Sequence, residues 1–76
     1  MKALTQKQAD VFRFIREYII DNGFPPTTPE IAAKFEIAYN AASDRLKALQ
    51  RKGAITMVPR KQRTIQPVKG FRVRIK

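Results

Sequence analysis

The side chains best suited to recognise another molecule gather in the second half of the chain, and most of them are cationic. Residues 45–76 hold eleven Lys and Arg and no acidic residue, whereas residues 1–44 hold five Lys and Arg and six Asp and Glu. This one-sided distribution, within a formal net charge of +10, predicts a polyanionic partner. The alternative is a basic segment that only keeps the protein in solution. A membrane surface is not expected, because that partner favours basic residues on an amphipathic helix.

The residue types that most enzymes and metal sites use are missing from the chain. It has no cysteine and no histidine, which removes the usual zinc ligands and the usual general base. Its six carboxylates show no pairing that indicates acid–base chemistry. We therefore expect no enzyme activity, no metal, no cofactor and no small-molecule substrate.

The length and the hydropathy pattern bound the class of protein. A chain of 76 residues predicts one small domain, covering residues 1–76. No apolar stretch approaches the roughly 20 residues of a membrane span. The first residues turn polar at once, unlike a signal peptide, so the expected compartment is the cytoplasm.

Capping signals and apolar spacing predict three helices. Thr5 and Gln8 form a capping box, and Gly23 suits the left-handed position that follows a helix. Thr27 and Glu30 form a second capping box. The expected helices cover about residues 6–21, 28–35 and 40–52. Their expected core side chains are Val11, Phe12, Ile15, Tyr18 and Ile19, broadened by Phe14 and Ile20, and then Ile31, Ala32, Phe35, Ala42, Leu46 and Leu49.

After Gly53 the pattern changes to that of β-strands. Residues 54–58 and 64–68 predict a hairpin. Residues 71–75 alternate apolar and basic side chains, and we expect them to pack as a third strand on this hairpin. The alternative is an exposed edge that seeks a partner strand. The predicted fold is therefore mainly α with a small antiparallel β-hairpin or sheet: a winged helix-turn-helix with three helices and then a basic wing.

The exposed face of the predicted third helix carries side chains that suit base edges in a DNA major groove. Asn pairs with adenine, Asp accepts from cytosine, Ser suits several edges and an Ala methyl packs on thymine. The alternative is a plain polar surface on which Asn40 or Asp44 caps the helix. The residues expected to contact bases are Asn40, Ala41, Ser43, Asp44 and Lys47.

A second group of cations is expected to meet DNA phosphates. Some follow the base-contacting residues on the third helix, and others lie in the predicted turn of the hairpin, where an Arg could enter a narrow minor groove. The alternative is a solvated run of charge. The members of this group are Arg45, Arg51, Lys52, Arg60, Lys61 and Arg63.

Several short stretches, in this order and spacing, resemble one known family. They are Met1-Lys2-Ala3-Leu4-Thr5, Val11-Phe12 with Ile15-Arg16, Gly23 with Pro25-Pro26-Thr27, Glu30-Ile31-Ala32, Asn40-Ala41-Ala42, and Leu46-Lys47-Ala48-Leu49 with Arg51-Lys52-Gly53. Across roughly residues 1–68 the chain resembles the N-terminal DNA-binding domain of the LexA repressor family. The resemblance implies a transcriptional repressor that binds a palindromic operator as a dimer.

The chain departs from that family in three respects. These 76 residues contain no counterpart of the family's self-cleaving domain, which uses a Ser–Lys dyad and supplies the dimer contact; Ser43 is the only serine. Ala38-Tyr39 stands where the family has a Ser-Pro helix start, and the stretch before it is about one residue shorter. Ser43-Asp44 replaces two consecutive glutamates that face the bases in the family, so we expect a different DNA sequence to be recognised.

Together these observations predict sequence-specific binding of double-stranded DNA by a transcriptional regulator, located at the nucleoid when bound. We expect a monomer in free solution that pairs only on a palindromic operator. The alternatives are a small protein-interaction module, which an exposed apolar patch would favour, and a structured-RNA-binding winged helix, which exposed stacking aromatics would favour. The operator, the regulated genes, the sign of regulation, the presence of a longer parent protein and the role of residues 69–76 lie beyond the sequence.

Overall fold

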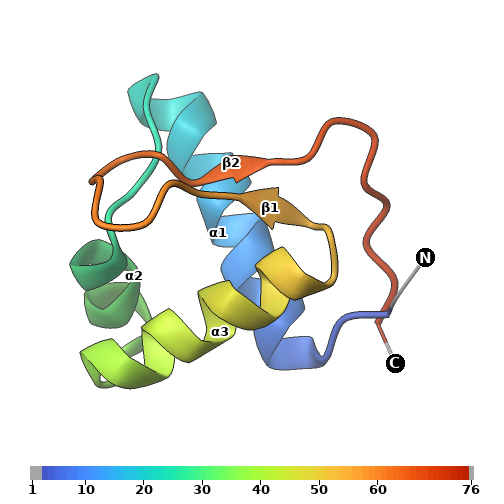
Figure 1. Cartoon of the computed structure of the whole chain (residues 1–76), viewed down its shortest axis with the longest axis horizontal. Helices are drawn as coiled ribbons and strands as arrows, with labels where there is room; N and C mark the ends of the chain where they lie inside the picture. The colour runs from blue at the N-terminus through green and yellow to red at the C-terminus, as the bar shows by residue number, and fades with distance from the viewer. Residues whose placement is uncertain (1–2, 76) are drawn as a thin grey trace.

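Residues 3–75 are described by a computed structural model, in which three helices surround one core and a short sheet covers it (Figure 1). The helices are α1 (Gln6–Asn22), α2 (Thr28–Phe35) and α3 (Tyr39–Arg51), and the strands are β1 (Ile55–Thr56) and β2 (Gln66–Pro67). The predicted class, mainly helical with a small antiparallel hairpin, is confirmed. None of the helices in residues 3–75 is long and apolar enough to cross a membrane.

The first two helices begin as their capping residues predict. The Thr5 hydroxyl accepts from the Gln8 backbone N–H, and the Gln8 side chain accepts from the Thr5 N–H. Thr27 and Glu30 make the same reciprocal pair at the start of α2. Helix α3 begins differently, because its N-cap is Ala38 and no side chain caps it. The alternative in which Asn40 or Asp44 caps the third helix is therefore wrong.

The core is formed by apolar side chains from all three helices and both sides of the hairpin. Leu4, Ala54 and Ile65 are buried in it from outside the helices. The buried residues among those predicted on the helices are Val11, Phe12, Ile15, Ile31, Ala32, Ala42, Leu46 and Leu49. The predicted core residues Phe14, Ile19 and Phe35 are only partly buried against this core. The prediction is wrong for Tyr18, which is half-buried outside the core cluster with its hydroxyl on Glu30, and for Ile20, of which 79% is exposed. Ile20 lies in the last turn of α1, which ends at Asn22.

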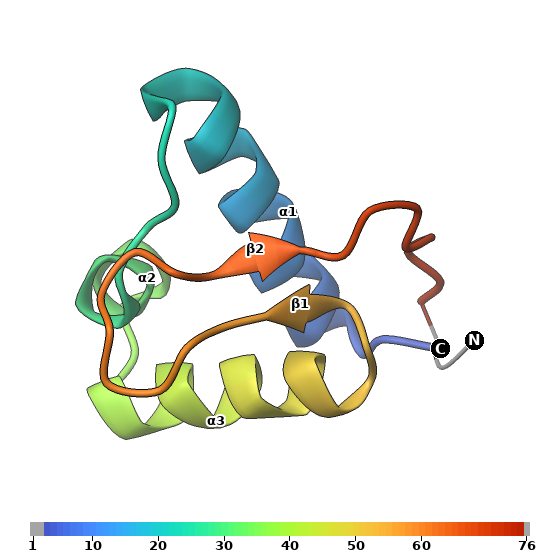
Figure 2. The same ribbon diagram turned by 45° about the horizontal axis from the view of Figure 1, so that its top comes forward.

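The hairpin is shorter than the sequence predicts. Only Ile55 and Pro67, and Thr56 and Gln66, are paired in register. The connecting residues 57–65, here called the wing, leave the ladder because the Thr64 hydroxyl takes the place of a strand partner: it accepts from the Val58 N–H and donates to nearby carbonyls. The wing lies above α2 and the first turns of α3 (Figure 2).

The prediction of a third strand at residues 71–75 is wrong. The sheet of the described residues has two strands, and residues 69–75, here called the tail, turn away from it at Gly70, which has a left-handed φ of 83°. Ile75 instead forms a parallel bridge with Leu4, and the Leu4 N–H donates to the Arg74 carbonyl at 2.6 Å. Met1, Lys2 and Lys76 lie outside the described residues.

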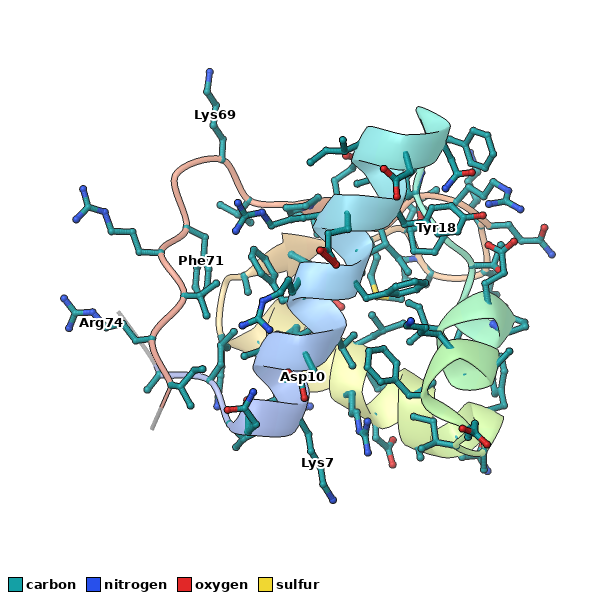
Figure 3. The ribbon with its side chains drawn as sticks, turned by 180° about the vertical axis from the view of Figure 1, so that it is seen from behind. Lys7, Asp10, Tyr18, Lys69, Phe71 and Arg74 are labelled. Atoms are coloured by element: carbon teal, nitrogen blue, oxygen red, sulfur yellow. The ribbon has the colours of Figure 1, made fainter. Side chains whose placement is uncertain are left out.

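The tail is fixed to the helices by its apolar side chains. The ring of Phe71 lies 5.5 Å from that of Phe12, centroid to centroid, and Val73 packs against the core. Phe71 points toward α1, whereas Lys69 and Arg74 project outward (Figure 3). The predicted inner apolar side thus holds for Phe71 and Val73, which pack against the core and α1 rather than on the hairpin, whereas Ile75 is 48% exposed.

Candidate nucleic-acid interface

Helices α2 and α3 form a helix-turn-helix pair with a three-residue turn. Glu36 occupies the left-handed region at a φ of 53°, and the Ile37 N–H donates to the Ala32 carbonyl at 3.0 Å. This turn lets α3 pack on both α1 and α2. The buried face of α3 consists of Ala42, Leu46 and Leu49, which leaves the opposite face of the helix to solvent.

All five predicted base-contacting residues lie outside that buried face. Asn40, Asp44 and Lys47 are exposed, and Ala41 and Ser43 are partly exposed. Since residues 40, 44 and 47 are spaced by three and four positions, their side chains share one side of α3. The structure brings the five residues together on the exposed side of the first nine residues of α3, with Ala41 as the one apolar member.

A groove of about 450 Å³ runs between this surface, the first turn of α2 and the wing. Ser43 and Lys47 line it from α3, together with Tyr39 and Gln50. Thr27, Thr28 and Pro29 line it from the start of α2. The remaining lining residues belong to the wing. We call this the interface groove.

Sequence reasoning missed some of the residues at the interface groove. Tyr39 is 57% exposed and precedes Asn40 at the start of α3. Thr28 lies beside the wing, although the two are far apart in sequence. The only signal for Thr28 was its position after a capping threonine, and the only signal for Tyr39 was an aromatic residue outside the apolar stripe.

The predicted phosphate-contacting cations fall into two groups. Arg51, Arg60 and Lys61 are exposed and Arg45 is partly exposed, and no ion pair within residues 3–75 involves them. Arg60 and Lys61 line the interface groove from the wing. These four cations keep their charge available to a partner.

Lys52 belongs to the other group, because its ammonium is bound inside the protein. Its Nζ donates to the Ala3 carbonyl at 2.8 Å and to Gln8 Oε1 at 2.7 Å. Lys52 follows α3 directly, so it ties the end of this helix to the capping box of α1. The side chain that the sequence predicts to meet phosphate thus already has two acceptors.

Arg63 is bound still more completely. Its guanidinium donates to both carboxylate oxygens of Glu30 at 3.1 Å and to the Pro25 carbonyl at 3.0 Å, and it lies 4.7 Å above the ring of Phe24. Tyr18 also donates to Glu30 at 3.2 Å. Hydrogen bonds from Arg63, and then the Thr27 backbone N–H, lower the pKa of Glu30 to about 2. The sequence marked Glu30 only as a helix cap.

Comparison with known proteins gives one consistent family. Residues 1–64 match the family described as the LexA DNA binding domain. The LexA repressor of Anaeromyxobacter sp. is 48% identical over 68 residues, covering 88% of this chain and 29% of that protein. The LexA repressor 1 of Pseudomonas syringae pv. tomato is 48% identical over 75 residues, covering 97% of this chain and 37% of that protein. The chain spans about a third of the length of these relatives.

Proposed function

From the fact that this chain belongs to the family of LexA DNA-binding domains, we propose that it binds double-stranded DNA sequence-specifically and represses transcription. In this proposal, α3 enters the major groove, and the wing lies on the backbone or in the adjacent minor groove. Two copies pair on a palindromic operator, whereas the free protein is monomeric. We propose repression rather than activation because the relatives are named as repressors.

One observation carries the proposal: the polar face of α3 opens directly onto a groove that is edged by cations. Asn40 and Asp44 offer hydrogen-bond donors and acceptors for base edges, and Lys47 extends the same side of the helix. Arg60 and Lys61 lie across the groove on the wing. Of the predicted base-contacting residues, Ser43 and Lys47 therefore share this groove with phosphate-binding cations, whereas Asn40 and Asp44 are exposed on the same helix outside its lining. Such a combination of base-specific and phosphate-binding groups suits a DNA duplex.

The test is a selection from randomised duplex DNA in the presence of excess duplex RNA, followed by affinity measurements on the enriched sequence. We expect a palindromic consensus and discrimination against mismatched duplexes. The Asn40→Ala variant should lose discrimination at one base pair of each half-site. Enrichment without a consensus, or equal competition by duplex RNA, would refute sequence-specific DNA binding. In the latter case a structured-RNA binder would be the better description.

A further inference from the structure

We propose that Arg63 is a positioning residue: with Glu30 it clamps the wing to the start of α2, and it sets the width of the interface groove without touching DNA. The inference rests on the proposed function, because it assigns a part in DNA binding to a residue of the same site. It replaces the phosphate contact that the charge pattern predicts for Arg63. The cations that contact the backbone from the wing are then Arg60 and Lys61.

The contacts of Arg63 leave its guanidinium little capacity for a phosphate. A phosphate is bound best by the planar fork of an arginine, with two parallel N–H bonds. In this protein that fork already holds both oxygens of Glu30, and one of its nitrogens also donates to the Pro25 carbonyl. One face of the fork covers the ring of Phe24. A phosphate at this end of the guanidinium would have to break the pair with Glu30. The Nε–H and the second Nη2–H remain, but a phosphate bound there would lie next to the Glu30 carboxylate, which also carries a negative charge.

The wing needs such a clamp because its base is weak. Only two residue pairs join β1 to β2, and an isolated two-stranded ribbon of that length is not stable by itself. Residues 57–65 are otherwise held by the Thr64 hydroxyl and by the burial of Ile65. Arg63 connects this loop to residues more than thirty positions earlier in the chain. It also holds a left-handed φ of 58°, a conformation that surrounding contacts must support.

The clamp acts on the groove through Glu30. This residue lies in the first turn of α2, where its carboxylate also accepts from the Thr27 N–H at 2.7 Å. Thr27 lines the interface groove, as does Arg63 itself. One carboxylate therefore joins the wing to the helix end on the opposite wall. If the clamp opens, only the molecules with a closed wing can bind, and the apparent Kd equals the intrinsic Kd divided by the fraction of molecules in that state.

Glu30→Gln distinguishes the two roles considered for Arg63, because a phosphate contact and a wing clamp predict opposite changes in DNA affinity. Glutamine at this position preserves the capping box, so α2 keeps its start. The substitution raises the net charge from +10 to +11 and releases Arg63. If Arg63 serves as a phosphate contact, DNA affinity should rise. If it clamps the wing, affinity should fall by roughly three- to tenfold despite the added charge. Glu17→Gln, which removes an exposed acid on α1 away from the groove, is the matched control.

The double variant Glu30→Gln, Arg63→Gln restores the net charge of +10. If Arg63 clamps the wing, the double variant should bind DNA more weakly than the wild type. The salt dependence of its binding should be unchanged, because the bound complex makes the same phosphate contacts. Under a phosphate contact, the slope of log K against log salt should fall in magnitude by about 0.9.

Hydrogen exchange of the free protein is the readout that does not depend on DNA. The amides of Val58 and Lys61, which donate to the Thr64 hydroxyl and to the Val58 carbonyl, should exchange faster in Glu30→Gln than in Glu17→Gln, while those of α3 stay protected. Unchanged wing exchange, or tighter binding of Glu30→Gln than of Glu17→Gln, would overturn the clamp. If no variant bound any duplex, the proposed function would fail, whereas faster wing exchange would still support the clamp.

Discussion

Binding of this protein to DNA should be steeply salt-dependent, and the slope of log K against log salt follows from the number of cations that can contact phosphates. Each phosphate neutralised contributes about −0.9 to the slope of log K against log salt. Five cations on α3 and the wing have no acidic partner among residues 3–75: Arg45, Lys47, Arg51, Arg60 and Lys61. Five contacts give a slope of about −4.5. The sequence alone, with about six contacts, predicts a slope near −5.

Single substitutions separate the available cations from those already bound. Lys61→Gln should weaken binding to every duplex and reduce the magnitude of the slope by about 0.9, because Lys61 is exposed on the wing. Lys52→Gln should leave the slope unchanged, because the Lys52 ammonium is bound to the Ala3 carbonyl and to Gln8. Its cost should appear as a loss of roughly 1 kcal/mol in the free energy of unfolding.

Fluorescence anisotropy with a labelled duplex, titrated at several salt concentrations from about 50 to 300 mM, measures both quantities. Chemical denaturation of the same variants gives the free energy of unfolding. A wild-type slope shallower than about −2 would refute the claim that the basic half of the chain holds a polyanion. Equal slopes for Lys61→Gln and the wild type, or a shallower slope for Lys52→Gln, would refute the division of cations made here.

Four further outcomes are expected. Asn40→Ala should lose about 1–3 kcal/mol of discrimination at one base pair with little change on random duplexes, as an affinity matrix of variants and sequences would show. Sedimentation of the free protein at micromolar concentration should give a monomer. The pKa of Glu30 in the folded protein is about 2, against an ordinary value of 4.5. The ionised carboxylate therefore stabilises the fold above about pH 4.5, and this contribution is lost as the pH falls from 4.5 to 2. The difference in Tm between the wild type and Glu30→Gln should accordingly narrow from pH 7 to pH 3. Phe71→Ala should cost about 2 kcal/mol of stability through its lost contact with Phe12, whereas Arg72→Ala, on the outer side of the tail, should cost little.

The parts of the fold that follow from neighbouring residues could be predicted from the sequence. Capping boxes place the starts of α1 and α2, and Gly23 ends α1 in the left-handed conformation, because the groups involved lie within four positions of each other. The same holds for the face of α3, since helical spacing alone separates Ala42, Leu46 and Leu49 from the polar side.

The parts of the fold that depend on residues far apart in the sequence could not be predicted from the sequence. The alternation at residues 71–75 correctly indicates an extended segment with one apolar side, but it does not say which surface that side covers. Its apolar side covers α1 at Phe12, and its backbone pairs with Leu4, so both partners lie some sixty to seventy positions earlier. Ile20 shows the same limit in reverse: its spacing fits the apolar stripe of α1, yet nothing covers the end of that helix on its side.

The basic half of the chain shows why charge alone overcounts an interface. Arg60, Lys61 and Arg63 are close in sequence, and composition treats them alike, but only the first two have no acidic partner among residues 3–75. Arg63 differs from them because Glu30 lies next to it. The sequence identifies Glu30 as part of a capping box and gives no sign that it also pairs with Arg63. A carboxylate at the start of α2 both caps that helix and neutralises a wing cation, so the acidic half of the chain helps to shape the basic surface. The affinity of the wing for DNA then depends on how firmly one of its own cations is held away from the DNA.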